Sequence, residues 1–145
     1  MTATRILFVC LGNICRSPAA EGMLRALAPH LTLDSAGTGG WHVGDPPYGP
    51  VQKAAKARGI DLSQLRARQF SATDFDAFDL ILAMDAQNLS DIEKLRPSGH
   101  ETPARMLADQ DVPDPYYTRD FVGFLDIIAA ANLRLLADIS VSPDR

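Results

Sequence analysis

Short apolar runs alternate along the chain with longer segments whose apolar residues recur every three or four positions. The continuous apolar runs over Arg5–Cys10 (RILFVC) and Asp79–Met84 (DLILAM) are typical of parallel strands buried on both faces. A shorter strand is predicted over Leu31–Ser35, and Ala104–Ala108 is a weaker candidate. The apolar pattern therefore predicts four strands, spread over most of the chain.

Helices are predicted between these strands. Ser17 is a candidate N-cap, with Pro18 at the first helical position and Glu21 in the first turn, so we expect a helix to begin at Ser17. A second helix is predicted to start at Pro50, and Gly59 supplies its C-terminal stop. Both helices follow a predicted strand in the chain.

The second half of the chain repeats this order. Asp85 is expected to cap a third helix, which runs to Pro97. Residues 109–120 are expected to form an exposed loop, because Pro113 and Pro115 exclude a central strand there. A last amphipathic helix is predicted from an apolar stripe made of Phe121, Phe124, Leu125, Ile128, Ala131, Leu135 and Ile139.

Regular alternation of strands and helices predicts an α/β fold with a parallel sheet and helices on both of its faces. Four strands favour a small doubly wound sheet. Ligands of such sheets bind beyond the carboxyl ends of the strands, where the strand order reverses. Cys10 ends the first predicted strand, so we expect it to lie at the ligand-binding edge.

Composition and charge narrow the class of protein. The 145 residues, 46% hydrophobic and 22% charged, suit one globular domain over residues 1–145. With 14 basic against 18 acidic residues, the net charge of −4 gives no drive toward nucleic acid or anionic membrane, and we expect neither as a partner. No apolar run is long enough for a signal peptide or a membrane span, so we expect a cytoplasmic protein.

The segment Cys10–Ser17 (CLGNICRS) places a thiol at a strand end, shortly before a helix N-terminus. We expect the backbone amides of this loop and the helix dipole to bind a dianionic phosphate. The amides are those of Leu11, Gly12, Asn13, Ile14, Cys15, Arg16 and Ser17. Gly12 permits a close approach of the backbone, and Asn13 tolerates a left-handed conformation. The Arg16 guanidinium can bind two phosphate oxygens at once.

Cys10 is the candidate nucleophile of this loop. The positive surroundings would favour its thiolate at neutral pH, and a Ser17 hydroxyl bonded to the sulfur would stabilise it as nucleophile and as leaving group. The structural alternative is a buried, small apolar Cys10 beside a solvated Arg16. The chemical interpretation is favoured because Cys, Arg and Ser at this spacing after a strand seldom coincide by chance. The loop has no Lys, which excludes a Walker-type nucleotide site.

The segment VCLGNICRSPAAE resembles the signature of the low-molecular-weight protein tyrosine phosphatases. The likeness continues in the family's order through DSAGT with Trp41 after it, HVGDPP, ARQF, DLILAMD and DPYY, and so covers nearly the whole chain. The resemblance implies a four-stranded parallel sheet of order 2-1-3-4. It also implies metal-independent hydrolysis of phosphotyrosine and other aryl phosphate monoesters through a cysteinyl-phosphate intermediate. Its expected partner is a phosphotyrosine-containing protein or peptide.

Asp114 is the candidate general acid. A phenolate leaving group needs a proton, and Pro113 and Pro115 stiffen the loop on either side of Asp114. Among the residues alone Asp111 competes for this role, because a loop aspartate is usually a turn former. The resemblance to the family's DPYY favours Asp114, which would also activate water in the second step.

Aromatic residues in exposed segments are candidates for the substrate pocket. Trp41, Tyr116 and Tyr117 could flank a phenyl ring, with Trp41 the strongest of the three. For either tyrosine, local packing of the loop on the core explains the residue equally well. No cluster of residues has metal-ligand spacing, so the sequence implies no metal and no other cofactor.

Support of the loop is expected from Ser35, which resembles a family serine that hydrogen-bonds the loop asparagine. The chain departs from the family at Leu65, where a histidine is often found, and this puts the remaining support in doubt. Glu21, a candidate partner for that support, receives no catalytic role. Cys15 suggests a regulatory disulfide with Cys10, against the alternative of an ordinary buried thiol.

Two other functions compete with the phosphatase. A thiol-dependent arsenate reductase on the same fold would need resolving cysteines, and none follows Cys15 in this chain. A catalytically idle phosphate-binding module would keep the loop but lose the nucleophile or the acid, and both candidates are present. We expect a monomer, with a weak dimer as the alternative.

Overall fold

A computed structural model describes residues 3–140. Its parallel strands form one sheet in the order β2-β1-β3-β4. The strands are β1 (Arg5–Cys10), β2 (Thr32–Gly37), β3 (Leu80–Ala83) and β4 (Ala104–Met106). The expected α/β class and the strand order implied by the family resemblance are both confirmed.

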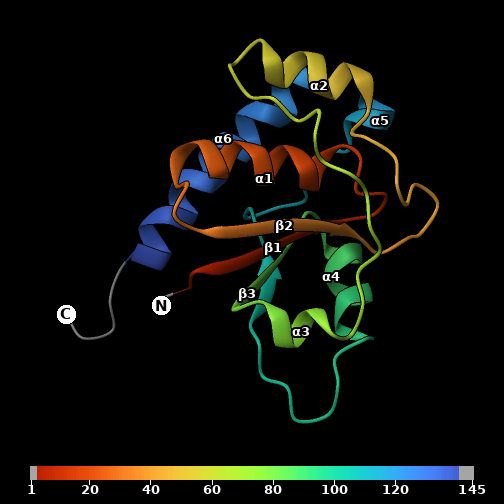
Figure 1. Cartoon of the computed structure of the whole chain (residues 1–145), viewed down its shortest axis with the longest axis vertical. Coiled ribbons are helices and arrows are strands. Elements are labelled where there is room, and N and C mark those ends of the chain that lie inside the picture. The colour runs from red at the N-terminus through yellow and green to blue at the C-terminus, as the bar shows by residue number, and fades with distance from the viewer. Residues whose placement is uncertain (1–2, 141–145) are drawn as a thin grey trace.

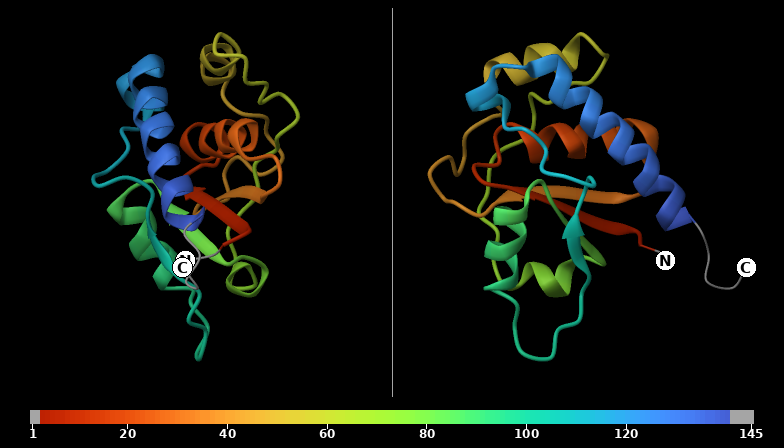
Figure 2. Two further views of the ribbon diagram at one scale, coloured as in Figure 1. Left: turned by 90° about the vertical axis from the view of Figure 1, so that its left-hand side faces the viewer. Right: turned by 180° about the vertical axis from the view of Figure 1, so that it is seen from behind.

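Helices cover both faces of the sheet (Figure 1). One face carries α1 (Arg16–Leu27) and the long α6 (Phe121–Ser140), with α2 (Gly49–Lys56) and α5 (Pro115–Thr118) beyond them (Figure 2). The opposite face carries α3 (Asp74–Ala77) and α4 (Ala86–Glu93). Helix α6 runs back toward the end of the sheet at which β1 begins. Within residues 3–140, no helix has the length and apolarity needed to cross a membrane.

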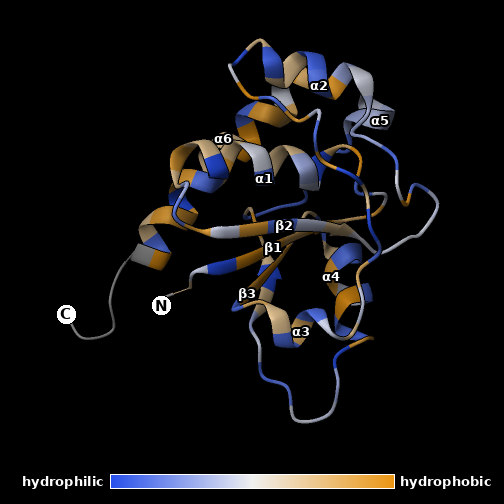
Figure 3. Cartoon of the chain, in the orientation of Figure 1, coloured by the Kyte–Doolittle hydropathy of each residue, from blue (hydrophilic) through white to orange (hydrophobic). Residues whose placement is uncertain are grey.

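Alternate residues of β1 point into two separate cores. Ile6 and Phe8 pack in the cluster that includes α1 and α6, whereas Leu7 and Val9 pack in the cluster on the α3 and α4 side. All four side chains are fully buried. Because both faces are covered, the strand is a continuous apolar run rather than an alternating one. Figure 3 shows this hydrophobic character along β1 and β3.

The start of α1 differs from the sequence prediction. The helix begins at Arg16 with Cys15 as N-cap, so the prediction that Ser17 caps it is wrong. Pro18 consequently occupies the third helical position, and Glu21 lies beyond the first turn. The physical reason is that the Ser17 hydroxyl lies against the Cys10 sulfur and is not available to cap the helix.

Two short helices were not predicted. Helix α3 precedes β3, and α5 interrupts the expected loop 109–120. Helix α5 has Pro115 at its first position and Asp114 as a side-chain N-cap, which are ordinary helix-start residues. Its four residues are too few to show a helical repeat in the sequence.

Asp79 joins the beginning of β1 to the beginning of β3. Its Oδ2 accepts hydrogen bonds from the backbone N–H groups of Thr4 at 3.1 Å and Arg5 at 3.0 Å. The Arg5 guanidinium lies 2.7 Å from the other carboxylate oxygen. The hydrogen bond from this guanidinium, helped by the two backbone donors, lowers the pKa of Asp79 from 3.8 to about 2.

Replacing this carboxylate tests how much it stabilises the sheet. We expect Asp79→Asn to lower the free energy of unfolding at neutral pH by about 1 kcal/mol, because the pair with Arg5 is partly screened by solvent. The pKa is depressed in the folded state, so the stabilisation is complete above about pH 4 and is lost as the pH falls toward about 2. Urea unfolding across this range measures the difference from the wild type, and a difference independent of pH would contradict the prediction.

Candidate active site

The chain between β1 and α1 curls around the thiol of Cys10. The backbone N–H of Asn13 donates to the sulfur at 3.3 Å, and the Ser17 hydroxyl oxygen lies 3.0 Å from it. Asn13 adopts the left-handed conformation expected of it, with a φ of 59°. A buried sulfur with two neighbouring donor groups is suited to carry a negative charge.

The side chain of Asn13 attaches this loop to three other segments. Its Nδ2 donates to the Ser17 hydroxyl at 2.8 Å and to the Ser35 hydroxyl at 3.0 Å. Its Oδ1 accepts the backbone N–H of Arg68 at 3.0 Å. The Ser35 hydroxyl in turn donates to Glu21 Oε1 at 2.7 Å. The structure thus brings Ser35 against Asn13, as the family resemblance implies.

The carboxylate of Glu21 lies buried behind Ser35. Its Oε2 forms an ion pair of 2.6 Å with Arg25, which also donates to the carbonyl of Leu33. Burial raises the pKa of Glu21, opposed by the hydrogen bonds from Ser35 and Arg25. Leu65 packs half-buried against the core. The cationic partner of Glu21 is Arg25. The sequence analysis missed Arg25, although a basic residue four positions after a helical Glu is a recognisable signal.

The guanidinium of Arg16 is buried and held from behind. Its NH1 donates to Asp85 Oδ2 at 2.8 Å and to the carbonyl of Val112 at 3.0 Å. Burial lowers its pKa, but the neighbouring Cys10, Asp85 and Asp114 raise it, and the net shift is upward. Asp85 was predicted only as a helix cap. It does cap α4, through a 2.7 Å bond from the N–H of Asn88, and it also orients Arg16.

Asp114 and its competitor Asp111 lie in different surroundings. Asp114 Oδ1 accepts the backbone N–H of Tyr116 at 3.0 Å, and its Oδ2 lies 3.7 Å from Arg16 NH2. Asp111 instead accepts the backbone N–H of Ala86 at 2.9 Å, at the start of α4. The structure therefore brings Asp114, and not Asp111, to the guanidinium beside Cys10.

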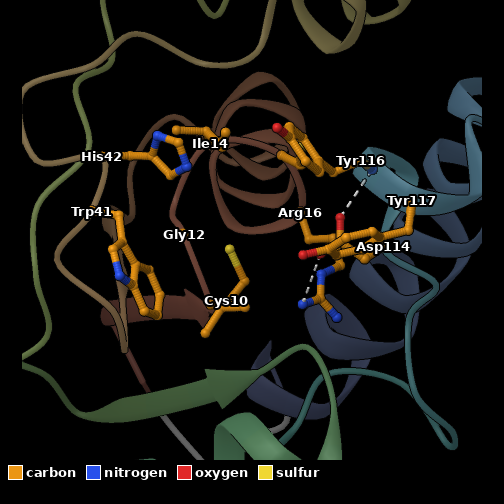
Figure 4. Close-up of a pocket in the computed structure, with 11 residues that line it drawn as sticks. Cys10, Gly12, Ile14, Arg16, Trp41, His42, Asp114, Tyr116 and Tyr117 are labelled. Carbon is orange, nitrogen blue, oxygen red and sulfur yellow. Dashed lines mark hydrogen bonds and ion pairs between the residues drawn. The ribbon is translucent and has the colours of Figure 1, made fainter.

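A pocket of about 300 Å³ opens above the Cys10 sulfur (Figure 4). Figure 4 shows Trp41 and His42 on one side of the thiol and the Asp114 loop with its two tyrosines on the other. Among the described residues, its lining comprises Cys10, Leu11, Gly12, Ile14, Cys15, Arg16, Trp41, His42, Asp114, Tyr116 and Tyr117. Asn13, Ser17 and Ser35 are outside this lining and hold the loop from behind.

His42 is a pocket residue that the sequence analysis missed. Its Nδ1 lies 3.1 Å from Asp45 Oδ2, and its ring lies so close to Gly12 that a Cβ there would be 3.1 Å from Cδ2. A histidine in an irregular loop carries no periodic signal that could have placed it. A side chain at position 12 would therefore require a small shift of the His42 ring.

Comparison with known proteins decides the family. The sequence model of the family described as low molecular weight phosphotyrosine protein phosphatase matches residues 5–142. The chain belongs to this family. Family membership makes it a hydrolase that acts on phosphotyrosine, and it favours the phosphatase over the arsenate reductase and the idle binding module.

Individual relatives support the phosphatase assignment over most of the chain. The low molecular weight protein-tyrosine-phosphatase YfkJ of Bacillus subtilis is 42% identical over 92% of this chain and 94% of its own length. PtpA of Staphylococcus aureus is 37% identical over 87% of each chain. The crystal structure of YfkJ matches with a TM-score of 0.87, covering 96% of both chains. Wzb of Vibrio vulnificus, determined in complex with benzylphosphonate, matches at 27% identity with a TM-score of 0.86, covering 93% of this chain and 98% of its own.

The two cysteines of the phosphatase differ in their surroundings. Both are free thiols and both line the pocket. Burial, followed by the charges of Asp114 and Cys10, raises the pKa of Cys15 from 9.0 to about 12. Cys15 is therefore a thiol at neutral pH. The proposed regulatory disulfide between Cys10 and Cys15 stays a prediction.

The high pKa of Cys15 predicts selective alkylation of the two cysteines. At neutral pH, iodoacetamide should modify Cys10 and leave Cys15 intact, because the thiolate is the reactive form and a pKa near 12 leaves roughly 1 in 10⁵ of Cys15 ionised. Peptide mass spectrometry identifies the modified residue, and inorganic phosphate should slow the reaction. A Cys15→Ser variant is the matched control and should be alkylated at the wild-type rate. Faster labelling of Cys15 than of Cys10 would contradict the assignment.

Gly37, at the end of β2, lies directly against the loop between Cys10 and Ser17. It pairs with Cys10 in the sheet. A Cβ built on Gly37 would lie 2.8 Å from the carbonyl oxygen of Leu11 and 3.1 Å from the backbone nitrogen of Asn13. Both contacts are with backbone atoms, which cannot move aside by changing a rotamer.

We therefore expect Gly37→Ala to displace the loop and to weaken binding of inorganic phosphate by about tenfold or more, because phosphate binding depends on the placement of the loop amides. The inhibition constant of phosphate measures this effect. Gly49→Ala is a suitable control, since a Cβ there meets no atom within 4 Å. Equal phosphate affinity in the two variants would show that the loop tolerates the added methyl group.

Proposed function

We propose that this phosphatase hydrolyses phosphotyrosine and other aryl phosphate monoesters, without a metal, through phosphorylated Cys10. The observation that carries the proposal is that Asp114 meets Cys10 and Arg16, from a distant segment of the chain, at one pocket. The NH1 of Arg16 is bonded to Asp85 and Val112, so Nε and NH2 are left to bind phosphoryl oxygens together with the loop amides.

In the first step the Cys10 thiolate attacks phosphorus. The S–P bond forms as the bond from phosphorus to the aryl oxygen breaks, and Asp114 gives its proton to the leaving phenolate. In the second step Asp114 takes a proton from water, whose oxygen attacks phosphorus as the S–P bond breaks. Inorganic phosphate forms and the Cys10 thiolate is restored, stabilised by the Asn13 N–H and the Ser17 hydroxyl.

Three aromatic side chains provide the aryl specificity in this proposal. Trp41 is 73% exposed, Tyr116 45% and Tyr117 73%, and all three line the pocket mouth above Cys10. Exposed aromatic rings at a polar pocket favour a flat aryl group over a flexible alkyl chain. The benzylphosphonate in the Vibrio vulnificus Wzb complex, an aromatic phosphonate, agrees with such a pocket. We also propose that residues 1–145 act as one catalytic domain, since the family model spans residues 5–142. We propose further that this domain acts as a monomer.

Hydrolysis of p-nitrophenyl phosphate tests the mechanism. The wild type should turn over in the presence of a chelator, and Cys10→Ser should abolish turnover because no phosphocysteine can form. Asp114→Asn should reduce kcat by about 10² to 10⁴-fold, because the variant loses the base that activates water in the second step, even though p-nitrophenolate needs little protonation.

Asp111→Asn is the matched control for the acid. It removes a carboxylate from the same loop, and its activity should stay within a few-fold of the wild type because Asp111 contacts the start of α4. Phosphate binding by the wild type with no turnover would move the assignment to a binding module. An equal loss in both aspartate variants would overturn the choice of Asp114.

A further inference from the structure

Arg119 occupies a strained position at the end of the helix that carries Asp114. It is the C-cap of α5, and Asp114 is the N-cap of the same four-residue helix. Its φ of 64° lies in the left-handed region, which is unfavourable for a residue with a Cβ and persists where other contacts enforce it. Because α5 is only one turn long, a single helical turn separates Arg119 from Asp114.

Several contacts hold Arg119 in this conformation. Its NH1 donates to the Tyr48 hydroxyl at 2.8 Å. Its guanidinium carbon lies 5.6 Å from the ring centroid of Tyr48 and 5.3 Å from that of Phe121, within the range of cation–π attraction. The backbone N–H of Arg119 donates to the carbonyl of Pro115 and closes the helix. The side chain is therefore held by the rings of Tyr48 and Phe121 and by the hydroxyl of Tyr48.

Tyr48 links α5 to the phosphate-binding loop. Its backbone N–H donates to the carbonyl of Ile14 at 2.8 Å, so its backbone is fixed to the loop around Cys10. Its ring lies 5.2 Å from that of Tyr116, in the first half of α5. Tyr48 thus contacts both ends of the short helix and the loop that would bind phosphate.

We propose that Arg119 and Tyr48 form a clasp that sets the position of Asp114 relative to the phosphate-binding loop. They are positioning residues for protonation of the leaving group. The inference rests on the proposed function, because it takes Asp114 as the general acid. Asp114 itself is 3.7 Å from Arg16 NH2, a loose ion pair, and its other contact is within its own loop. Proton donation requires hydrogen-bond distance, so an acid on a single helical turn needs an external anchor.

A competing role for Arg119 is direct contact with an acidic residue of a peptide substrate. Arg119 is exposed, and its partner Tyr48 packs against Tyr116, which lines the pocket. The clasp is favoured because the Tyr48 hydroxyl and two rings already engage the guanidinium. The two roles differ in their effect on small substrates, which have no flanking residues.

The test uses leaving groups that differ in their need for a proton. Phenolate is more basic than p-nitrophenolate, so loss of acid positioning should slow phenyl phosphate more than p-nitrophenyl phosphate. Tyr48→Phe removes the hydroxyl and retains the ring, and Arg119→Gly removes the clasp while accepting the left-handed backbone. For phenyl phosphate we expect kcat/KM to fall about fivefold in Tyr48→Phe and about tenfold or more in Arg119→Gly, against about twofold or less for p-nitrophenyl phosphate.

Arg96→Gln is the matched control. The Arg96 guanidinium carbon lies 4.7 Å from the Phe75 ring centroid on the other face of the sheet and is paired with Glu93. Its loss should lower the thermal unfolding temperature without changing the ratio of the two rates. A double-mutant cycle adds the decisive comparison: in an Asp114→Asn background, Tyr48→Phe should have no further effect on phenyl phosphate.

The possible outcomes separate the clasp from the function on which it rests. If Asp114→Asn slows phenyl phosphate selectively but the clasp variants slow both substrates equally or not at all, the clasp is wrong and the acid stands. If the variants lose activity only toward phosphopeptides with acidic neighbours, Arg119 is a peptide contact and the clasp is again wrong. If Asp114→Asn itself shows no dependence on the leaving group, the acid assignment and the clasp fail together.

Discussion

The buried amide of Asn13 is the constraint on which the rest of the site depends. For the loop to curl around the Cys10 sulfur, the backbone must turn back on itself, and it does so through the left-handed Asn13. Such a conformation is unfavourable for a residue with a Cβ, and here it is offset by hydrogen bonds to α1, to β2 and to the segment before α3. The shape of the loop is thereby tied to the register of the sheet, which sets Ser35 opposite Phe8, two residues before Cys10.

Charge is distributed around this loop so that each buried ion has a partner. Arg16 forms ion pairs with Asp85 through NH1 and with Asp114 through NH2. Glu21 forms an ion pair with Arg25. A buried charge without a partner would cost several kcal/mol, and removal of one member of a buried pair is correspondingly destabilising. The arrangement also restricts how Arg16 can turn, so a ligand encounters a guanidinium whose direction is already set.

How far the sequence predicts this structure depends on the range of the interactions involved. The buried strands and the placement of Cys10 at a strand end follow from local patterns, and the motif from Cys10 to Ser17 identifies the loop. The bond of Arg16 to Asp85 spans 69 residues, and that of Asn13 to Arg68 spans 55, so neither has a local signal. For Ser17 the sequence predicts both a helix cap and a contact with the Cys10 sulfur, and only the contact is found, because a hydroxyl placed between the sulfur and the Asn13 amide is not available to the helix N-terminus.

The direction of the strands has a consequence for how the enzyme can be joined to other molecules. Strand β1 begins at one end of the sheet and places Cys10 at the other, where the parallel strands end. Helix α6 returns to the end of the sheet where β1 begins (Figure 1). The beginning of β1 and the end of α6 therefore lie away from the pocket mouth. A tether, tag or second domain attached at either of these two points leaves the mouth of the pocket uncovered. The anchored enzyme can then still receive a phosphorylated side chain from a large protein.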